Sequence, residues 1–227
     1  MSNRSLSVAV LVALAAPCLA EDAPAFKKGD KVVFLGDSIT QGGNGPKGYV
    51  GLIRAAFAEK HKDLGVEVMN AGVSGNKVPD LTRRLQKDVL DKKPALVVIY
   101  IGINDVWHGE KNPANGTSKA DFDSGLRAII GKITAGGGKV VICTPTVIGE
   151  KAENTLDAKL DEYSDVSRKI AADLKLPLVD LRKAFADHLK ANNKENKDKG
   201  VLTGDRVHLN EAGNKLVADS ILKAILK

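Results

Sequence analysis

The chain has 227 residues, with 34 Lys or Arg and 28 Asp or Glu, so its formal net charge is +6 at pH 7. Hydrophobic residues make up 43% and charged residues 27%, which is typical of a globular protein and excludes a chain that is disordered throughout. Two cysteines are too few for the disulfide scaffold of a small secreted domain.

The first 20 residues have the pattern of a secretory signal peptide. Arg4 precedes an apolar run over 6–16, and Cys18 and Ala20 are small residues at the −3 and −1 positions of a cleavage site. An apolar run of this length spans about 17 Å as a helix, which is too short for a bilayer core of about 30 Å, so we do not expect a membrane anchor. A lipoprotein signal is disfavoured because Pro17 stands directly before the cysteine.

Cleavage after Ala20 leaves residues 21–227, which we expect to form one domain that is secreted or periplasmic. Cys143 is the one cysteine of this mature chain and lies in an apolar, strand-like run, so we expect a buried, unreactive thiol. Lysines are dispersed along the chain and aromatic residues make up only 4%, so nucleic acid is not an expected partner.

Strand-like and helix-like segments alternate along the rest of the chain. Short runs rich in Val, Ile or Leu predict strands at 31–36, 66–70, 95–102, 139–144 and 178–181. Apolar residues at helical spacing predict helices at 49–62, 78–90, 119–135, 156–174 and from 211 towards the C-terminus. Several strand runs are apolar at consecutive positions, which indicates strands covered on both faces. The sequence therefore predicts an α/β fold, a three-layer sandwich around a five-stranded parallel sheet.

Ligands of such folds bind beyond the carboxyl ends of the strands, and four polar segments fall there or in the last loop. They are GDSIT at 36–40, NAGVSGN at 70–76, GIND at 102–105 and DRVH at 205–208. Each alone is also typical of a turn or a helix cap. Together they contain a hydroxyl nucleophile, Ser38, and an acid–base pair, Asp205 and His208, which would activate it.

Acyl transfer also needs N–H donors for the oxyanion that develops, and glycine backbone and asparagine side chains can supply them. The chain contains no G-x-S-x-G motif around Ser38, so the arrangement is not that of the α/β-hydrolases.

The four segments, in this order, resemble the sequence blocks of the SGNH or GDSL hydrolases and esterases. The resemblance implies a flavodoxin-like sandwich and acyl-enzyme chemistry without a metal or cofactor. It implies a triad of Ser38, Asp205 and His208, and an oxyanion hole formed by the backbone N–H groups of Ser38 and Gly75 and the side chain of Asn104.

The expected substrate is a small or polymeric ester with a short acyl group, foremost O-acetyl groups on carbohydrate. Export, the basic charge and the polar loops around the site favour this interpretation. Asp37, Trp107 and His108 are candidate substrate contacts, since an aromatic residue at the rim of the site can stack on a sugar.

Three alternatives remain open at this point. One is a lipase, lysophospholipase or thioesterase for longer acyl chains, and another is a glycan-binding protein of the same fold without activity. The third is a metal-dependent phosphoesterase, whose ligands would be Asp37, Asp105, Asp205 and His208.

Overall fold

The structure is a computed structural model that describes residues 26–110 and 112–226, so the predicted signal peptide lies outside the described residues. Five parallel strands form its sheet, in the order β2-β1-β3-β4-β5. They are β1 (Lys31–Gly36), β2 (Glu67–Gly72), β3 (Leu96–Tyr100), β4 (Lys139–Cys143) and β5 (Leu178–Val179). This order is the flavodoxin-like one, so the α/β fold predicted from the sequence is confirmed.

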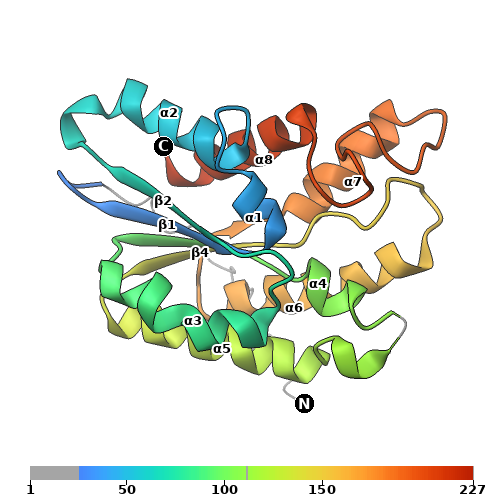
Figure 1. Cartoon of the computed structure of the whole chain (residues 1–227), viewed down its shortest axis with the longest axis horizontal. Helices are drawn as coiled ribbons and strands as arrows, with labels where there is room; N and C mark the ends of the chain where they lie inside the picture. The colour runs from blue at the N-terminus through green and yellow to red at the C-terminus, as the bar shows by residue number, and fades with distance from the viewer. Residues whose placement is uncertain (1–25, 111, 227) are drawn as a thin grey trace, which may run out of the picture.

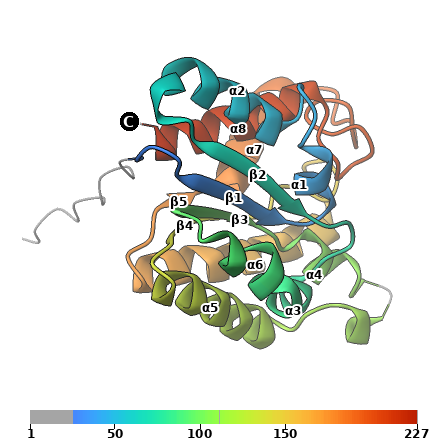
Figure 2. The same cartoon turned by 60° about the vertical axis from the view of Figure 1, so that its left-hand side comes forward.

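Helices cover both faces of the sheet (Figures 1 and 2). One face carries α2 (Tyr49–Lys60), α7 (Leu181–Asn192) and α8 (Glu211–Ile225), and the other carries α3 (Val78–Asp88), α5 (Lys119–Ala135) and α6 (Thr155–Asp173). Two short helices, α1 (Ser38–Gly42) and α4 (Ile103–Trp107), begin just after β1 and β3. Turns of 3-10 helix occupy Lys62–Leu64, Leu90–Lys92 and Pro113–Asn115.

The alternation of side chains along each central strand supplies two hydrophobic cores. In β1, Val32 and Phe34 pack with residues of α2 and α8, whereas Val33 and Leu35 pack with residues of α3 and α5. All four side chains are fully buried. The consecutive apolar positions of the sequence therefore do reflect strands with helices on both faces.

The last strand and the helix after it differ from the sequence prediction. The run 178–181 forms a strand only at Leu178–Val179, and α7 follows at once without having been predicted. Asp180 caps this helix by accepting the N–H of Lys183 at 3.0 Å. Leu181 and Phe185 are buried one helical turn apart and attach the helix to the core.

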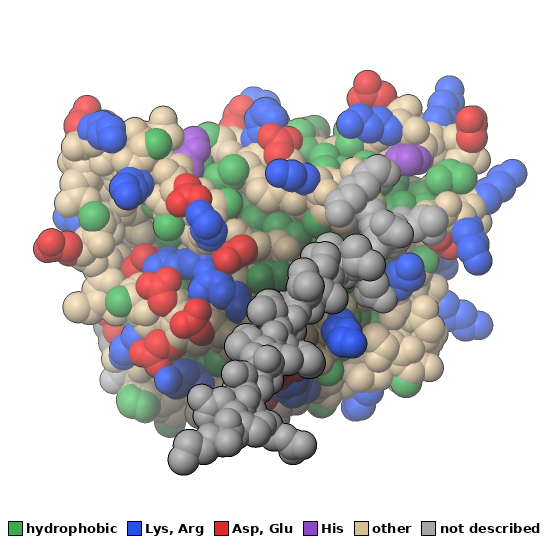
Figure 3. Space-filling view, turned by 180° about the vertical axis from the view of Figure 1, so that it is seen from behind, with side chains coloured by type: hydrophobic (Ala, Val, Ile, Leu, Met, Phe, Trp, Pro, Cys, Tyr) green, Lys and Arg blue, Asp and Glu red, His purple; other side chains and the backbone are tan. Residues whose placement is uncertain are grey.

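On the face of the molecule opposite to Figure 1, basic and acidic side chains are interspersed rather than separated into fields of one sign (Figure 3). Exposed ion pairs are common in the described part of the chain, and Lys183–Asp187 on α7 is one example. Between residues 26 and 226, with residue 111 left aside, no helix is both long and apolar enough to cross a membrane. Cys143 is buried, as expected, and burial raises the pKa of its thiol.

Candidate active site

Ser38 lies at the junction of β1 and α1, beyond the carboxyl end of the strand (Figure 1). The carboxylate of Asp37 caps α1 by accepting the N–H of Ile39 at 2.9 Å. Because Ser38 is the first residue of the helix, its own N–H has no partner within the helix. The strand order reverses between β1 and β3, and such a switch point is where ligands bind in open parallel sheets.

His208 connects Ser38 to Asp205 although 170 residues separate Ser38 from the histidine. The Nε2 atom of His208 lies 2.9 Å from Ser38 Oγ, and its Nδ1 atom lies 2.7 Å from Asp205 Oδ2. The arrangement is that of a nucleophile, a base and an orienting carboxylate. The side chain of His208 is 44% exposed, so a substrate can reach the imidazole from solvent.

A tight turn before α8 brings the carboxylate of Asp205 beneath the ring of His208. Asp205 Oδ1 accepts the backbone N–H groups of Val207 and His208, at 3.1 and 2.7 Å, while Oδ2 faces the ring. Some loss of hydration at Asp205 opposes ionisation, but the hydrogen bonds from His208 outweigh it and lower the pKa of the carboxyl. Arg206 adopts φ +89°, in the region that favours glycine, so the turn holds backbone strain.

The two other segments predicted to supply oxyanion donors contact each other. Asn104, in the first turn of α4, is buried and donates one amide hydrogen to the carbonyl of Asn76 at 3.1 Å. Asn76 follows Gly75, whose φ of +75° a residue with a side chain rarely adopts. The loop after β2 is also tied to α1, because the N–H of Ser74 donates to the side chain of Gln41 at 2.8 Å. The loop that contains Gly75 is thus hydrogen-bonded to Asn104 on one side and to α1, the helix of Ser38, on the other.

Two buried carboxyls, those of Asp37 and Asp105, lie next to Ser38 and Asn104 in the chain. Asp37 is 2% exposed, and burial raises its pKa to about 7 despite the hydrogen bond from Ile39. Asp105 is 1% exposed and accepts the N–H of Val78 at 3.1 Å, and burial raises its pKa to about 6. The negative charge of Asp105 is one of the causes that raise the pKa of Asp37.

Comparison with known proteins identifies the family. The family model described as "GDSL-like Lipase/Acylhydrolase family" matches residues 34–216. The chain belongs to the GDSL-like lipase/acylhydrolase family.

Relatives and solved structures agree with this assignment. An acetylxylan esterase of Geobacillus stearothermophilus is 32% identical in an alignment 215 positions long that covers 87% of this chain and 94% of the relative. The crystal structure of an acetyl xylan esterase called AlAXEase is 44% identical, with a TM-score of 0.81, and the match covers 86% of this chain and all of that one. Axe2, an acetylxylan esterase from Geobacillus stearothermophilus, matches with a TM-score of 0.78 and 30% identity over 89% of this chain and 96% of its own. Like these GDSL relatives, the chain is a carboxylic ester hydrolase.

In this GDSL hydrolase, a hollow of about 510 Å³ lies between the start of α3 and the end of α4. Its lining residues are Lys77, Trp107, His108, Glu110, Ala114 and Asn115. Trp107 is 39% exposed, which makes it one of few large hydrophobic side chains at the surface of the described chain. A side chain at Gly75 would lie 3.9 Å from the ring of His108, so His108 lies between the hollow and the loop after β2.

The four candidate ligands of the metal-dependent alternative do not form a common cluster. Asp37 is buried as a helix cap, whereas Asp205 is exposed and paired with His208. Within 26–110 and 112–226, no group of three or more His, Cys, Asp or Glu is placed to hold a metal ion.

Sequence reasoning missed Arg84, which joins the strand ends beneath the site of this GDSL hydrolase. Its guanidinium donates to the carbonyl of Gly36 at 2.7 Å, to that of Ala71 at 2.8 Å and to the side chain of Asn76 at 2.6 Å. A salt bridge to Asp88 at 2.9 Å completes its contacts. Arg84 therefore connects the ends of β1 and β2 to Asn76. Asn76 in turn accepts the hydrogen bond from the amide of Asn104.

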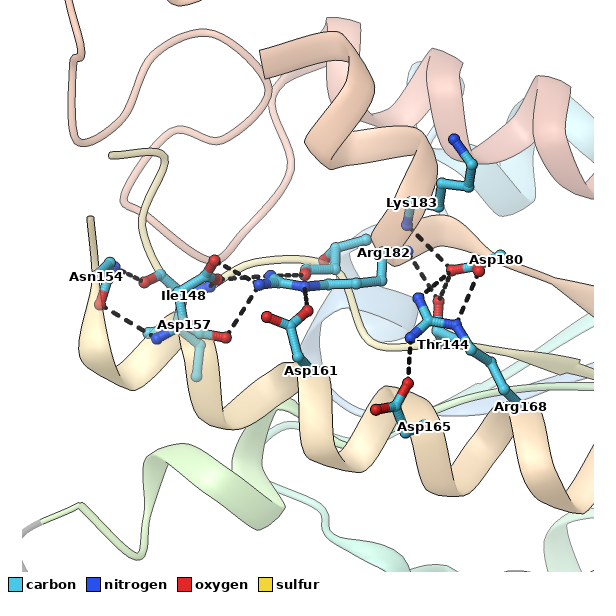
Figure 4. Close-up of polar contacts among 11 residues, drawn as sticks. Thr144, Ile148, Asn154, Asp157, Asp161, Asp165, Arg168, Asp180, Arg182 and Lys183 are labelled. Atoms are coloured by element: carbon cyan, nitrogen blue, oxygen red, sulfur yellow. Dashed lines mark hydrogen bonds and ion pairs between the residues drawn. The ribbon is translucent and has the colours of Figure 1, made fainter. Parts of the chain in front are cut away.

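Arg182, on α7, is a second residue that sequence reasoning missed. Its guanidinium bonds to both carboxylate oxygens of Asp157 at 2.7 Å, to Asp161 at 2.8 Å and to the carbonyl of Thr146 at 2.8 Å (Figure 4). Burial disfavours the cation, but the hydrogen bonds that Arg182 donates to the two carboxylates outweigh burial and raise the pKa of Arg182. This cluster fixes the chain that leaves β4 against α6 and α7.

Proposed function

We propose that this esterase removes short acyl groups, foremost O-acetyl groups, from carbohydrate, with Ser38, His208 and Asp205 as its catalytic triad. The observation that carries the chemistry is the hydrogen-bonded chain from Ser38 through His208 to Asp205, with distances of 2.9 and 2.7 Å. The likeness to acetylxylan esterases over most of the chain supports the substrate class.

The proposed reaction forms an acyl-enzyme and then hydrolyses it. His208 Nε2 takes the proton of the Ser38 hydroxyl while Oγ attacks the ester carbonyl, and Asp205 stabilises the imidazolium that results. The imidazolium returns this proton to the departing alcohol, which leaves the acyl group on Ser38. A water molecule then attacks the acyl carbonyl, its proton passing to His208 and on to Oγ, and the carboxylic acid is released.

Three N–H donors are proposed to hold the oxyanion of each tetrahedral intermediate. They are the backbone N–H groups of Ser38 and Gly75 and the second amide hydrogen of Asn104. The N–H of Ser38 is free of the helix, and the Asn104 amide is fixed through the bond that it donates to Asn76. Donors held in place before the reaction need not reorganise as charge develops, which is why such contacts lower the barrier.

The hollow beside the donors is proposed to take the sugar portion of the substrate. Its lining combines the exposed Trp107 with the polar side chains of Lys77 and Glu110, and an aromatic ring among polar groups suits the mixed faces of a sugar better than an alkyl chain. His108 lies between this hollow and Gly75, so we assign it a substrate contact as well. Asp37, buried as the cap of α1, supports Ser38 rather than touching the substrate.

A secreted or periplasmic location after removal of residues 1–20 remains part of this proposal, and residues 21–227 would then form the single mature domain. The pattern of Arg4, the apolar run and the small residues before position 21 supports it. N-terminal sequencing of the exported protein, produced in a host with a matching secretion system, tests this location. The proposal requires a mature chain that begins at Glu21.

Hydrolysis of p-nitrophenyl acetate, butyrate and octanoate, with acetylated xylo-oligosaccharides alongside, tests the proposed substrate class. We expect kcat/KM to be at least about tenfold higher for acetate than for octanoate, and acetate to be released from the oligosaccharides. The Ser38→Ala variant controls for contaminating esterases and should release nothing above background. A preference for octanoate would contradict the proposed short acyl group, and wild-type activity in Ser38→Ala would contradict the triad.

A further inference from the structure

Glu150 is a buried carboxylate that the reaction described above does not use. Its side chain is 3% exposed and lies after β4, at the end of a stretch, 141–150, in which every residue is buried. A carboxylate is costly to bury unless its oxygens accept several hydrogen bonds. Glu150 meets this condition with four donors, all of them neutral groups of residues 201–203.

The donors come from three consecutive residues of the chain that leads into the Asp205–His208 turn. The N–H of Val201 donates to Oε2 at 2.8 Å, and the N–H groups of Leu202 and Thr203 donate to Oε1 at 2.8 and 2.5 Å. The hydroxyl of Thr203 donates to Oε1 as well, at 2.7 Å. One side chain therefore fixes three successive backbone positions, 51 to 53 residues further along the chain.

The last of these positions, Thr203, begins the catalytic loop, by which we mean residues 203–209. Thr203 and Leu209 pair across the base as an isolated antiparallel bridge, and the N–H of Gly204 donates to the carbonyl of His208 at 2.8 Å. Asp205 and His208 lie between the two residues of this bridge, on either side of the strained backbone at Arg206. A shift at the base would therefore move the imidazole relative to Ser38.

The chain that leads to Glu150 is itself held in place by residues of α6 and α7. We call residues 144–150 the support segment. Arg182 holds its first part by donating to the carbonyl of Thr146. Asp157 accepts the N–H of Ile148, as Figure 4 shows. Its last part touches the loop around the triad directly, since the N–H of Gly149 donates to the carbonyl of Arg206 at 2.7 Å.

We propose that Glu150 is a positioning residue, whose carboxylate sets the distance between His208 and Ser38 by holding the base of the catalytic loop. The proposal rests on the proposed function, because it needs His208 to act as the base. Proton transfer between Ser38 and His208 depends on a contact of 2.9 Å, and a displacement of about 1 Å is enough to cost roughly 100-fold in rate.

Glu150→Gln is the variant that tests this role with the least change in shape. The amide keeps one oxygen acceptor, but its NH₂ group must face a backbone N–H, so one hydrogen bond is replaced by a donor–donor contact. We expect kcat for p-nitrophenyl acetate to fall about 10- to 100-fold and KM to change less than about threefold. Glu153→Gln, the same substitution at an exposed position three residues further along the chain, should leave both constants unchanged.

The same substitution in a His208→Ala background separates positioning from a general loss of structure. If Glu150 acts through His208, the effect of Glu150→Gln should shrink to less than about threefold once the imidazole is absent. An equal loss in both backgrounds, or an unchanged kcat in Glu150→Gln, would overturn the proposal. Wild-type activity of His208→Ala alone would overturn the proposed function and this proposal with it.

Thr203→Val covers the case in which Glu150→Gln does not fold. It removes one of the four donors and preserves the shape of a fully buried side chain. We expect a two- to tenfold fall in kcat, and again less than a twofold effect when His208 is replaced by alanine. An unchanged kcat in Thr203→Val together with an unfolded Glu150→Gln would assign Glu150 to stability alone.

Discussion

Asn104 carries two amide hydrogens, and the structure accounts for one of them. It donates one to the carbonyl of Asn76 at 3.1 Å, and this bond fixes the plane of the amide. The orientation of the second hydrogen is thereby set before a substrate arrives. A buried side chain, 4% exposed, loses little further freedom when it binds the oxyanion, so its contact can favour the transition state over the ground state.

Asn104→Ala should therefore lower kcat for p-nitrophenyl acetate by about 10²- to 10³-fold with little change in KM. Steady-state kinetics over a range of ester concentrations up to saturation measure kcat and KM. Asn192→Ala, at the exposed end of α7, is the matched control and should keep the wild-type kcat. A loss below about threefold in Asn104→Ala would remove this side chain from the proposed oxyanion hole.

The elements of the fold show which features the sequence could predict. Strands β1 to β4 and the helices α2, α3, α5, α6 and α8 were predictable because each carries a long apolar pattern of its own. Leu181, Phe185 and Leu189 do repeat every four residues along α7, but the charged residues between them hid the pattern. The strand β5 was predicted at 178–181, but it pairs through only Leu178 and Val179, and so short a segment has no periodicity from which its end could be placed.

In the site, too, local sequence patterns could be recognised and contacts between distant parts of the chain could not. Ser38, Gly75, Asn104, Asp205 and His208 stand in short local motifs, so their positions could be predicted from the sequence. Arg84 and Glu150 could not be predicted in this way. Their partners Gly36 and Leu202 are 48 and 52 residues away, and only the folded chain brings them together.

The contact between α6 and α7 depends on a buried ion pair between Arg182 and Asp157 (Figure 4). Arg182→Met would leave the carboxylate of Asp157 without its cation, and removing one partner of a buried pair costs about 3–5 kcal/mol. We expect a loss of this size in the free energy of unfolding, measured by urea denaturation. Lys183→Met, which removes the cation of an exposed pair on the same helix, should change it by less than about 0.5 kcal/mol. Equal losses in the two variants would show that the Arg182 cluster does not stabilise the fold.

At the scale of the whole molecule, the buried carboxyls beneath the active site make stability depend on pH. Asp37 has a folded pKa of about 7, raised from 3.8 by burial, so the folded state binds its proton more tightly than the unfolded state does. This proton contributes its full stability below about pH 4, and the contribution is lost as the pH rises through about 7. Asp105, with a pKa raised to about 6, acts in the same direction.

Asp37→Asn should remove the larger of these two effects. Between about pH 4 and pH 8, the free energy of unfolding of the wild type should fall by up to about 4 kcal/mol relative to that of the variant. Denaturation curves at the two pH values measure the difference. Asp63→Asn, at an exposed position, should follow the wild type. Parallel pH profiles for the wild type and Asp37→Asn would show that Asp37 is ionised in the folded protein throughout this range.

Ser38 is proposed to be a nucleophile that His208 and Asp205 activate. Labelling with a fluorophosphonate, followed by mass spectrometry of the intact protein and of its peptides, tests this role. We expect one label per molecule, located on Ser38, much slower labelling of His208→Ala and none of Ser38→Ala. Labelling of Ser38→Ala at the wild-type rate, or a wild type that resists the reagent, would contradict it.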